Sequence, residues 1–510
     1  MEDKPLNERF GNALIEIEEL DGAVTCRCLL SNLIETGRFQ EALEFMKSNP
    51  EDVKLADEED WIPLHFVCIS ESTEFPMILL EKLIELSDVR AKDLSGQNPF
   101  QSLCGDALLS SAKTYRLTAI EMFLKYDPKL ARIPDEDSNM YPLHLYFAQG
   151  DLAFLQLPTP DEVMRGYRAI IDANPKVLSR QCESGMIPLH YLCRYFIPML
   201  APNSQLDEVS LSILSEVIEL YPKGVTKKDD SGRFPLHHLC RHLAPNYTSS
   251  KMIYSKLLGY DPSSVKDRNN WESSALQDYW NHVMNSNGDD YMRDFSEIAE
   301  LLLKCLFHET LNVPIQQWRL IHAAVSVGCP RAYLIYLLSR KGIDLNDRDN
   351  EGHTPLMKSI VKSSKFVADF GFEDEEIDDN YLDGSLDQDE CIPSSMMLLL
   401  KNNIKAASIP DTNGQLPLHK ALEKKSKWER GIKMLVNAAP NALCTRDKLS
   451  HLYPFMIAAN KNSLDICYQL LLIRPEIVKI ALNHVEDCLL VTNASKNEGQ
   501  MRRNKRAKIF

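Results

Sequence analysis

Apolar residues recur with helical spacing in short segments that occur in pairs. A short apolar segment at 188–193 is followed by a longer one at 211–220, where apolar residues return every three or four positions. Segments 63–68 and 77–86 follow the same order. Polar residues, glycine and proline gather between one pair and the next. This pattern predicts helix pairs joined by tight turns, without a central sheet.

A Pro-Leu-His motif marks the first helix of each pair. It occurs at 63–65, 142–144, 188–190, 235–237 and 417–419, and degenerate copies begin at Pro99, Ala275, Leu320, Pro355 and Pro454. The spacing between successive copies varies from 35 residues (320 to 355) to 62 residues (355 to 417). A metal or catalytic motif would not recur in this way. A stacked structural unit with loops of variable length would.

Turn and stop signals flank these helices. Asp-x-x-Gly-x-x-Pro begins at Asp93, Asp229, Asp349 and Asp411. Glycine permits a positive φ, aspartate can hydrogen-bond its own turn, and proline suits the first helical position. A second proline follows the longer helix and forces the preceding residue out of the α region. These prolines are Pro50, Pro128, Pro175, Pro222, Pro262 and Pro440.

The combined pattern resembles the ankyrin repeat family, most clearly over residues 320–356 and 458–471. The resemblance implies an all-α, ankyrin-type helix-pair solenoid of about eight to ten repeats at 51–475. Residues 1–50 are then expected to form an N-terminal helical cap, with helices at 13–20 and 39–46, because terminal repeats must present a polar outer face. Residues 476–510 are expected to form a terminal helix and a basic tail.

The repeats depart from the family pattern in two ways. Every spacing exceeds the usual 33 or so residues, and we expect the extra length to form loops between the two helices, as at 200–203 and 243–246. The family threonine before the proline survives only as Thr354. The Thr–His hydrogen bond of the family is therefore absent from most copies, and we expect apolar packing to hold the helices instead.

Cysteine and histidine recur as His-x-x-Cys at His65, His190 and His237. The alternatives are zinc ligands, a Cys–His nucleophile pair, or residues of the repeat core. The repeat favours the core, because Cys104 stands at the same position without a histidine, and cysteine packs as a small apolar residue. We expect Cys68, Cys104, Cys193 and Cys240 to be buried without metal. Cys26 and Cys28 are expected to pack in a cap helix.

Two charged segments interrupt this pattern. Residues 369–390 hold 11 acidic residues and no basic ones, which predicts a solvated insertion inside a repeat. The segment also partly resembles a calcium loop, but Tyr381 stands where an oxygen ligand is needed. The tail at 502–508 has five basic residues in seven, typical either of a nuclear import signal or of a solvated chain end.

Composition limits the classes of binding partner and the cellular compartment that we expect. The net charge of −16 argues against general binding to nucleic acid or anionic membrane. No apolar run approaches the roughly 20 residues that span a bilayer. The 13 cysteines are an odd number, and we expect them to be reduced thiols. The first ten residues lack the basic-then-apolar order of a signal peptide. We therefore expect a cytoplasmic protein, with the nucleus as the alternative.

The function expected from the resemblance is protein binding. No phosphate loop, nucleophile elbow or metalloprotease motif is present, so we expect no enzyme activity, catalytic residue, metal or cofactor. The partner is expected to be another protein, and the alternative is an adaptor or regulatory subunit that recruits a substrate to a separate enzyme. Family members bind through variable turn positions and the exposed face of the inner helix. The matching turn positions here are Trp61, Gln97, Met140, Met186, Arg233, His353 and Gln415.

Overall fold

The structure is a computed structural model of the 510-residue chain. It describes residues 14–18, 24–70, 76–105, 107–108, 113–149, 158–284, 292–307, 319–349, 351–361, 395–461 and 463–482. The chain divides into two compact units, Met1–Leu311 and Asn312–Phe510, which are described in turn. The acidic segment 369–390, the basic tail 502–508 and the end of the expected terminal helix lie outside the described residues; residues 477–482 are helical.

The first described residues of the N-terminal unit form a two-stranded hairpin. Strand β1 (Leu14–Glu18) pairs antiparallel with β2 (Val24–Cys28), so that Leu14 lies opposite Cys28. The expected helix at 13–20 is therefore wrong, and Cys26 and Cys28 lie in a strand. The sequences Leu-Ile-Glu-Ile-Glu and Val-Thr-Cys-Arg-Cys alternate apolar and polar residues and are rich in β-branched side chains, which favours strands.

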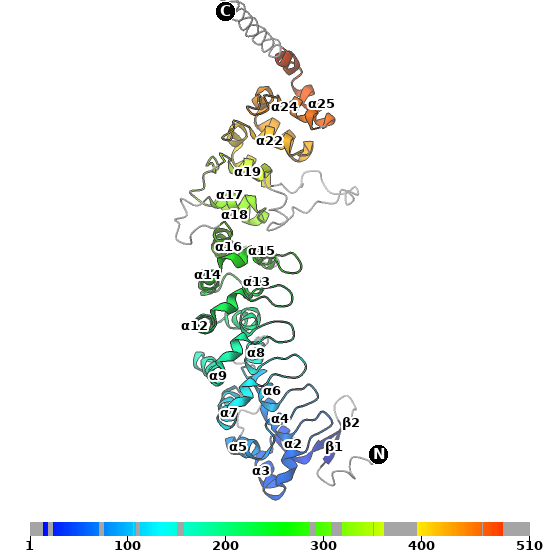
Figure 1. The fold of residues 1–510 in the computed structure, drawn as a ribbon, viewed down its shortest axis with the longest axis vertical. Coiled ribbons are helices and arrows are strands. Elements are labelled where there is room, and N and C mark those ends of the chain that lie inside the picture. Colours follow the sequence, from blue (N-terminus) through cyan, green and yellow to red (C-terminus); the bar gives the residue numbers. More distant parts are fainter. Residues whose placement is uncertain are drawn as a thin grey trace, which may run out of the picture. The chain divides into compact units, whose positions relative to one another are not determined.

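Seven helix pairs follow in the described part of this unit, each with an inner helix and an outer helix. The inner helices are α2 (Leu29–Glu35), α4 (Pro63–Ile69), α6 (Pro99–Gly105), α8 (Pro142–Phe147), α10 (Pro188–Tyr191), α13 (Pro235–His242) and α15 (Ala275–Met284). The outer helices are α3 (Phe39–Ser48), α5 (Met77–Leu86), α7 (Lys113–Tyr126), α9 (Pro160–Ala173), α12 (Ser204–Leu220), α14 (Ser250–Tyr260) and α16 (Met292–Leu306). Inner helices pack against inner helices and outer against outer, and the turns project on the inner side (Figure 1).

Proline ends the outer helices as the sequence predicts. The residues before Pro50, Pro128, Pro175, Pro222 and Pro262 have φ values of −133° to −152°. Each proline then opens a short 3₁₀ turn, beginning with η2 (Pro50–Lys54). The proline ring restricts the preceding residue to extended backbone, so the helix cannot continue through it.

Part of the extra length in the fifth pair is helical. Helix α10 continues through a π-helical turn, η5 (Leu192–Phe196), into α11 (Ile197–Leu200). Asn203 then caps α12, because its side-chain oxygen accepts the N–H groups of Gln205 and Leu206. The expected loop is thus confined to the residues after Leu200, and Arg194 lies within the π-turn.

The turns form a second, hydrogen-bonded row beside the inner helices. In most of them an aspartate side chain accepts the N–H of the residue two before the helix, as Asp93 does from Gln97 at 2.9 Å. Neighbouring turns are joined by backbone hydrogen bonds, from Leu94 N–H to the Glu59 carbonyl and from Glu136 N–H to that of Gly96. The turns therefore contribute to repeat stacking together with the helices.

The C-terminal unit contains four helix pairs in its described residues. They are α17 (Leu320–Ser326) with α18 (Arg331–Ser339), α19 (Pro355–Val361) with α21 (Ser395–Asn402), α22 (Pro417–Glu423) with α23 (Lys433–Ala438), and α24 (Pro454–Asn460) with α25 (Leu464–Ile473). Its turns are built in the same way, with Asp349 and Asp411 accepting from His353 and Gln415. The four pairs and the six that begin at α4 are the ten described repeats of an all-α, ankyrin-type fold.

Candidate functional site

The histidine of each Pro-Leu-His motif has a structural role. Its Nδ1 accepts the N–H of the residue before the proline, at 3.0–3.3 Å in all five helices. In four of them Nε2 lies 3.0–3.4 Å from a backbone carbonyl of the next repeat. These partners assign a neutral ring with the proton on Nε2. One side chain thus caps its own helix and binds the next repeat.

Glutamine takes this role in two of the repeats that lack the histidine, at Gln101 and Gln277. The Gln101 Oε1 accepts the Asn98 N–H at 2.8 Å, and its Nε2 donates to the Ile133 carbonyl of the next repeat at 3.1 Å. Gln277 accepts the Ser274 N–H in the same way. The Thr–His hydrogen bond is absent from the Pro-Leu-His copies, as expected. Their histidines nevertheless make polar contacts, which go to backbone groups instead of a threonine.

Burial keeps these histidines neutral. It lowers the pKa of His144, His190 and His237 to about 4. It also lowers the pKa of His65, His322 and His419, although carbonyl hydrogen bonds and nearby carboxylates oppose the shift. Where both ring nitrogens are bonded to backbone, the histidine has no free lone pair for a metal ion.

The recurring cysteines belong to the core. Cys68, Cys104, Cys193 and Cys240 are at most 1% exposed, which confirms the expected burial on the inner helices and, for Cys193, on η5. Burial also raises the pKa of each thiol. A thiol that remains protonated at neutral pH is a poor nucleophile and a poor metal ligand, so these side chains act as small apolar packing groups.

The expected partner-binding turn residues share a backbone role but differ in exposure. Trp61, Gln97, Met140 and Arg233 are half-buried, whereas Met186, His353 and Gln415 are at most 7% exposed. The carbonyl oxygen of each accepts a hydrogen bond from the backbone N–H at the start of its turn. The Trp61 ring stacks on His65, and Gln415 donates to Glu423. Only Arg233 among them lines the large pocket described next.

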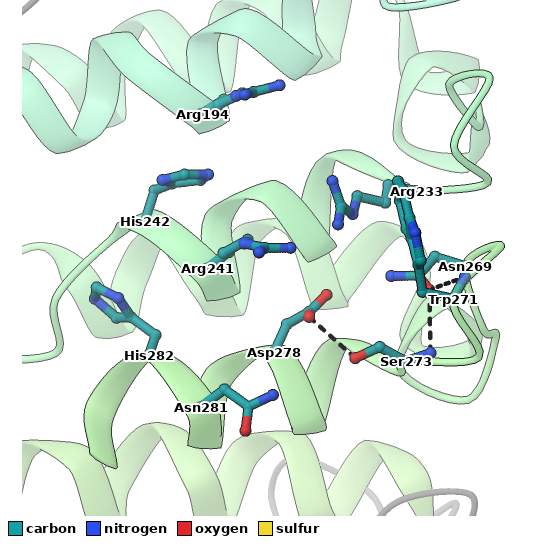
Figure 2. Close-up of a pocket in the computed structure, with 10 residues that line it drawn as sticks. All are labelled: Arg194, Arg233, Arg241, His242, Asn269, Trp271, Ser273, Asp278, Asn281 and His282. Atoms are coloured by element: carbon teal, nitrogen blue, oxygen red, sulfur yellow. Dashed lines mark hydrogen bonds between the residues drawn. The ribbon is translucent and has the colours of Figure 1, made fainter. Parts of the chain in front are cut away.

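A pocket of about 900 Å³ lies on the inner side of three successive repeats of the N-terminal unit (Figure 2). The residues that line it are Arg194, Arg233, Arg241, His242, Asn269, Trp271, Ser273, Asp278, Asn281 and His282. We call it the basic pocket. Its volume falls in the range of ligand sites, but its wall is mainly polar and charged, unlike the apolar wall of most cofactor sites.

The repeat brings these residues together by register. Arg194, Arg241 and Asn281 each stand six positions after the first residue of an inner helix, namely Pro188, Pro235 and Ala275. Stacking of the inner helices therefore sets the three side chains in a row. Arg233 and Ser273 come from the matching position of two successive turns, two residues before Pro235 and Ala275.

Contacts within the basic pocket fix several side chains. The Arg233 guanidinium lies over the Trp271 ring, 4.3 Å from its centroid, and Arg194 lies 4.9 Å from that of Tyr195. The Ser273 hydroxyl donates to Asp278 at 3.0 Å, and the Asn269 side chain accepts the N–H groups of Trp271 and Ser273. These contacts position a cationic and aromatic wall before any partner arrives.

The pKa values of the pocket residues reflect burial and crowded positive charge. Burial lowers the pKa of Arg233, and Arg241 and Arg194 lower it further. Burial also lowers the pKa of His242 to about 4, again with help from Arg194 and Arg241. The pKa of Asp278 is raised by burial, although Ser273 and the arginines oppose this. The pocket thus favours anions.

Sequence reasoning found Arg233 but missed most of this site. The sequence analysis expected partner contacts on the exposed face of the inner helix but named no residues there. Ser273 was not among the expected turn residues, because the motif that begins at Ala275 is degenerate. A usable signal was present: Arg194 and Arg241 share one repeat position in a chain with an excess of acidic residues. Trp271 could also be assigned to a turn from the Asn269 position, although its contact with Arg233 required the tertiary structure.

A second polar cluster lies in the C-terminal unit. Asp349, Glu351 and His353 bring ligand-type atoms within 4.8 Å of one another. The Lys358 ammonium lies 2.9 Å from Asp349 and 3.4 Å from Glu351. Despite burial, Lys358 and the His353 N–H lower the pKa of Asp349. A lysine already supplies the positive charge in this cluster, which makes it an ion-pair network of the turn.

Comparison with known proteins finds no matching family model and no matching curated sequence. Among solved structures, the human ASB11 ankyrin repeat domain is similar at 16% identity and a TM-score of 0.36, over 56% of this chain and 100% of that one. The Bcl-3 ankyrin repeat domain is similar at 12% and 0.33, over 54% and 98%.

A third similar structure is the predatory endopeptidase Bd0816 from Bdellovibrio bacteriovorus in complex with immunity protein Bd3460. It matches at 13% identity and a TM-score of 0.31, over 41% of this chain and 89% of that one. Within the described segments, no helix combines the length and apolar character that crossing a bilayer requires. The helix pairs, the hydrogen-bonded turns and the capping histidines give this chain an ankyrin-type repeat fold.

Proposed function

We propose that the protein is a non-enzymatic scaffold that holds another protein against the inner side of its N-terminal unit. The observation that supports this most is the basic pocket, which gathers side chains from three successive repeats on one open face. Repeat proteins typically bind partners across such extended surfaces. Arginine and tryptophan are also the residue types that most often dominate binding energy in protein interfaces.

The chemistry of the site fits binding better than catalysis. The repeated cysteines are buried with raised pKa values, and the repeated histidines are engaged as helix caps. In the basic pocket, the Ser273 hydroxyl hydrogen-bonds to a carboxylate. The pocket offers charge, hydrogen-bond donors and an aromatic ring, which suit recognition of a polar partner surface.

Site-specific photo-crosslinking in cells tests this proposal. A photoreactive phenylalanine analogue replaces His242 or Asn281 in the basic pocket, or Met252 on outer helix α14, where Met252 is 60% exposed. We expect one partner protein to be captured at 242 and 281 and not at 252. Capture at 252 alone, or no defined partner at either inner position, would contradict the proposal.

The turn residues provide a second test. Trp61→Ala, Met186→Ala and Arg233→Ala are compared for binding to the captured partner and for thermal stability. Arg233→Ala is expected to weaken binding with stability nearly intact, because Arg233 lines the pocket. Met186→Ala is expected to act mainly on stability, because that side chain is 7% exposed.

An adaptor role is the narrower alternative. It requires the scaffold to hold a substrate and an enzyme at the same time, and therefore a second binding surface. Sequential affinity purification, first through this chain and then through the captured partner, distinguishes the two roles. Recovery of an enzyme in the second step supports the adaptor, and a simple two-protein complex supports the scaffold alone.

A further inference from the structure

The basic pocket concentrates positive charge in an acidic chain. The protein has a net charge of −16, yet three guanidinium groups face one carboxylate in this pocket. Figure 2 shows Arg194, Arg233 and Arg241 approaching a common space from two helices and a turn, with Asp278 beside them. The three positive charges repel one another, and a bound anion would stabilise them.

The three arginines lack acidic partners among the described residues. No carboxylate of that part of the chain lies within ion-pair distance of them, whereas the exposed Arg165 pairs with Glu121 on the outer helices. The Nε atoms of Arg194 and Arg233 are also buried without a hydrogen-bond acceptor. The described part of the chain thus supplies neither a counter-ion nor an Nε acceptor to these guanidinium groups, so an anion that pairs with them would gain affinity.

The number and type of donors favour a phosphate group. A guanidinium presents a planar fork of N–H donors that matches phosphate and carboxylate oxygens, and a single carboxylate can accept only one such fork well. A phosphate monoester carries a charge of about −1.5 to −2 at pH 7 and three acceptor oxygens. It therefore matches three arginines better than a glutamate or aspartate side chain does.

The register of the pocket favours an extended chain as the bearer of the phosphate. Arg194, Arg241 and Asn281 occupy equivalent positions in three stacked repeats. Neighbouring helices are about 8–10 Å apart, so a segment of roughly six extended residues, at about 3.3 Å each, would cross all three. Asn281 and the Trp271 ring also line the pocket and would face the residues beside the phosphate.

We propose that the basic pocket binds a phosphorylated side chain within an extended segment of the partner protein, with Arg194, Arg233 and Arg241 holding the phosphate. This inference rests on the proposed scaffold function and names the chemistry of its partner. Arg194 and Arg241 bind from the inner side of two repeats, and Arg233 binds from the turn while stacked on Trp271.

Fluorescence polarisation on the full-length protein tests this inference. The probes are three fluorescein-labelled nine-residue peptide libraries with phosphoserine, glutamate or serine at the centre and mixed residues elsewhere. We expect the phosphoserine library to bind at least about tenfold more tightly than the glutamate library, which corresponds to about 1.4 kcal/mol. Equal binding of the three libraries, or no binding of the phosphoserine library, overturns the inference.

Matched variants locate the binding. Arg194→Met and Arg241→Met keep the aliphatic stem and remove the charge, and each is expected to weaken phosphoserine binding about tenfold or more. Arg168→Met is the control, because Arg168 is exposed on outer helix α9, away from the pocket. Thermal melts check that all three variants fold. An equal loss with Arg168→Met would show general charge attraction and overturn the inference.

Two further arms separate the outcomes. Inorganic phosphate competes with the labelled library, and an affinity equal to that of the peptides would overturn the assignment to a protein segment. The cross-linking at positions 242 and 281 leaves the three arginines in place and reads partner capture separately from phosphate selectivity. If a partner is captured there while the three libraries bind alike, the phosphate inference fails and the scaffold function stands. If the phosphoserine library binds selectively but no partner is captured, the scaffold function fails while the phosphate selectivity of the pocket stands.

Discussion

At the scale of single residues, the histidine of the Pro-Leu-His repeats shows how one side chain stabilises both its own helix and the contact with the next repeat. Its Nδ1 satisfies a donor at the start of its own helix, and its Nε2–H reaches the next repeat, as in His237 to the Asp267 carbonyl at 3.2 Å. Gln101 provides the same acceptor and donor with a different side chain. The requirement is therefore an acceptor and a donor in fixed positions, and histidine meets it only while neutral.

The buried histidines predict acid sensitivity. An unfolded histidine titrates near 6.5, and His144 and His237 titrate at about 4 when folded. The unfolded chain thus binds protons first as the pH falls, so their contribution is complete above 6.5 and is lost between about 6.5 and 4. Protonation of each of these two histidines can lower the free energy of unfolding by roughly 2–3 kcal/mol. Urea unfolding at pH 8, 6, 5 and 4 measures this loss, and constant stability over that range would contradict it.

Substitution of His237 separates its charge from its hydrogen bonds. His237→Gln should keep both bonds, as Gln101 does, remaining within about 1 kcal/mol of the wild type at pH 8 while flattening the pH dependence. His237→Ala leaves two backbone groups unpaired and should cost about 2–4 kcal/mol at pH 8, and this difference from the wild type should shrink toward pH 4, where the wild-type contribution is lost. A glutamine variant as damaged as the alanine variant would rule out the capping role.

The buried thiols give a second prediction at this scale. Cys193 is fully buried, and a serine hydroxyl in its place would need a hydrogen-bond partner. Cys193→Ser is expected to destabilise the protein by about 1–3 kcal/mol, and Cys193→Ala by less than the serine variant. Chemical denaturation measures both. A stable serine variant would indicate a polar environment that the core does not provide.

At the scale of elements, the turns are as constrained as the helices. Gly96 has a φ of +69°, and a Cβ there would lie 2.6 Å from the Glu136 Cβ of the next turn. The backbone hydrogen bond from Glu136 N–H to the Gly96 carbonyl requires this close approach. Glycine is thus needed both for its conformation and for the stacking of neighbouring turns.

Two glycine substitutions separate these needs. Gly37 has a φ of +73° with nothing within 4 Å of its added Cβ, so Gly37→Ala should cost only about 1–2 kcal/mol for the left-handed backbone. Gly96→Ala adds a steric clash with the next turn and should cost clearly more. Thermal and urea unfolding of both variants provide the comparison; equal losses would show that turn stacking contributes little.

At the scale of the whole molecule, length varies without disturbing the repeat. Successive copies are separated by 35 residues at 320–355 and by 62 at 355–417, yet the helix pairs on both sides form in the same way. A stacked repeat contacts mainly its neighbours, so an insertion within one repeat need not affect distant ones. The closure entropy of a long loop also grows slowly with its length.

Deletion of residues 369–390 tests this tolerance. We expect the melting temperature to remain nearly unchanged, because shortening the segment between two helices alters its closure free energy by less than about 1 kcal/mol. Differential scanning calorimetry with and without calcium measures the effect. A calcium-dependent rise in melting temperature that the deletion abolishes would favour the calcium-loop alternative instead.

The sequence by itself determined where the repeats lie and that each forms a helix pair. Turn, proline and Pro-Leu-His signals are local, because they act through φ restriction and hydrogen bonds within a few residues, and they located most of the ten described repeats. It also predicted the burial of Cys68, Cys104, Cys193 and Cys240, since one repeat position holds one environment. The N-terminal hairpin was missed because a five-residue strand such as β1 is too short for periodicity to distinguish from a helix.

Only the tertiary structure decided which charged and aromatic side chains come together in the basic pocket. Arg194, Arg233, Arg241 and Trp271 are up to 77 positions apart (194 to 271) and lie in one pocket because helices and turns stack in register. The sequence states which residues share a repeat position, but not which side chains of neighbouring repeats meet. These contacts between repeats depend on the π-turn after α10 and on the close approach of adjacent turns. Both features arise from packing across repeats rather than from local sequence signals.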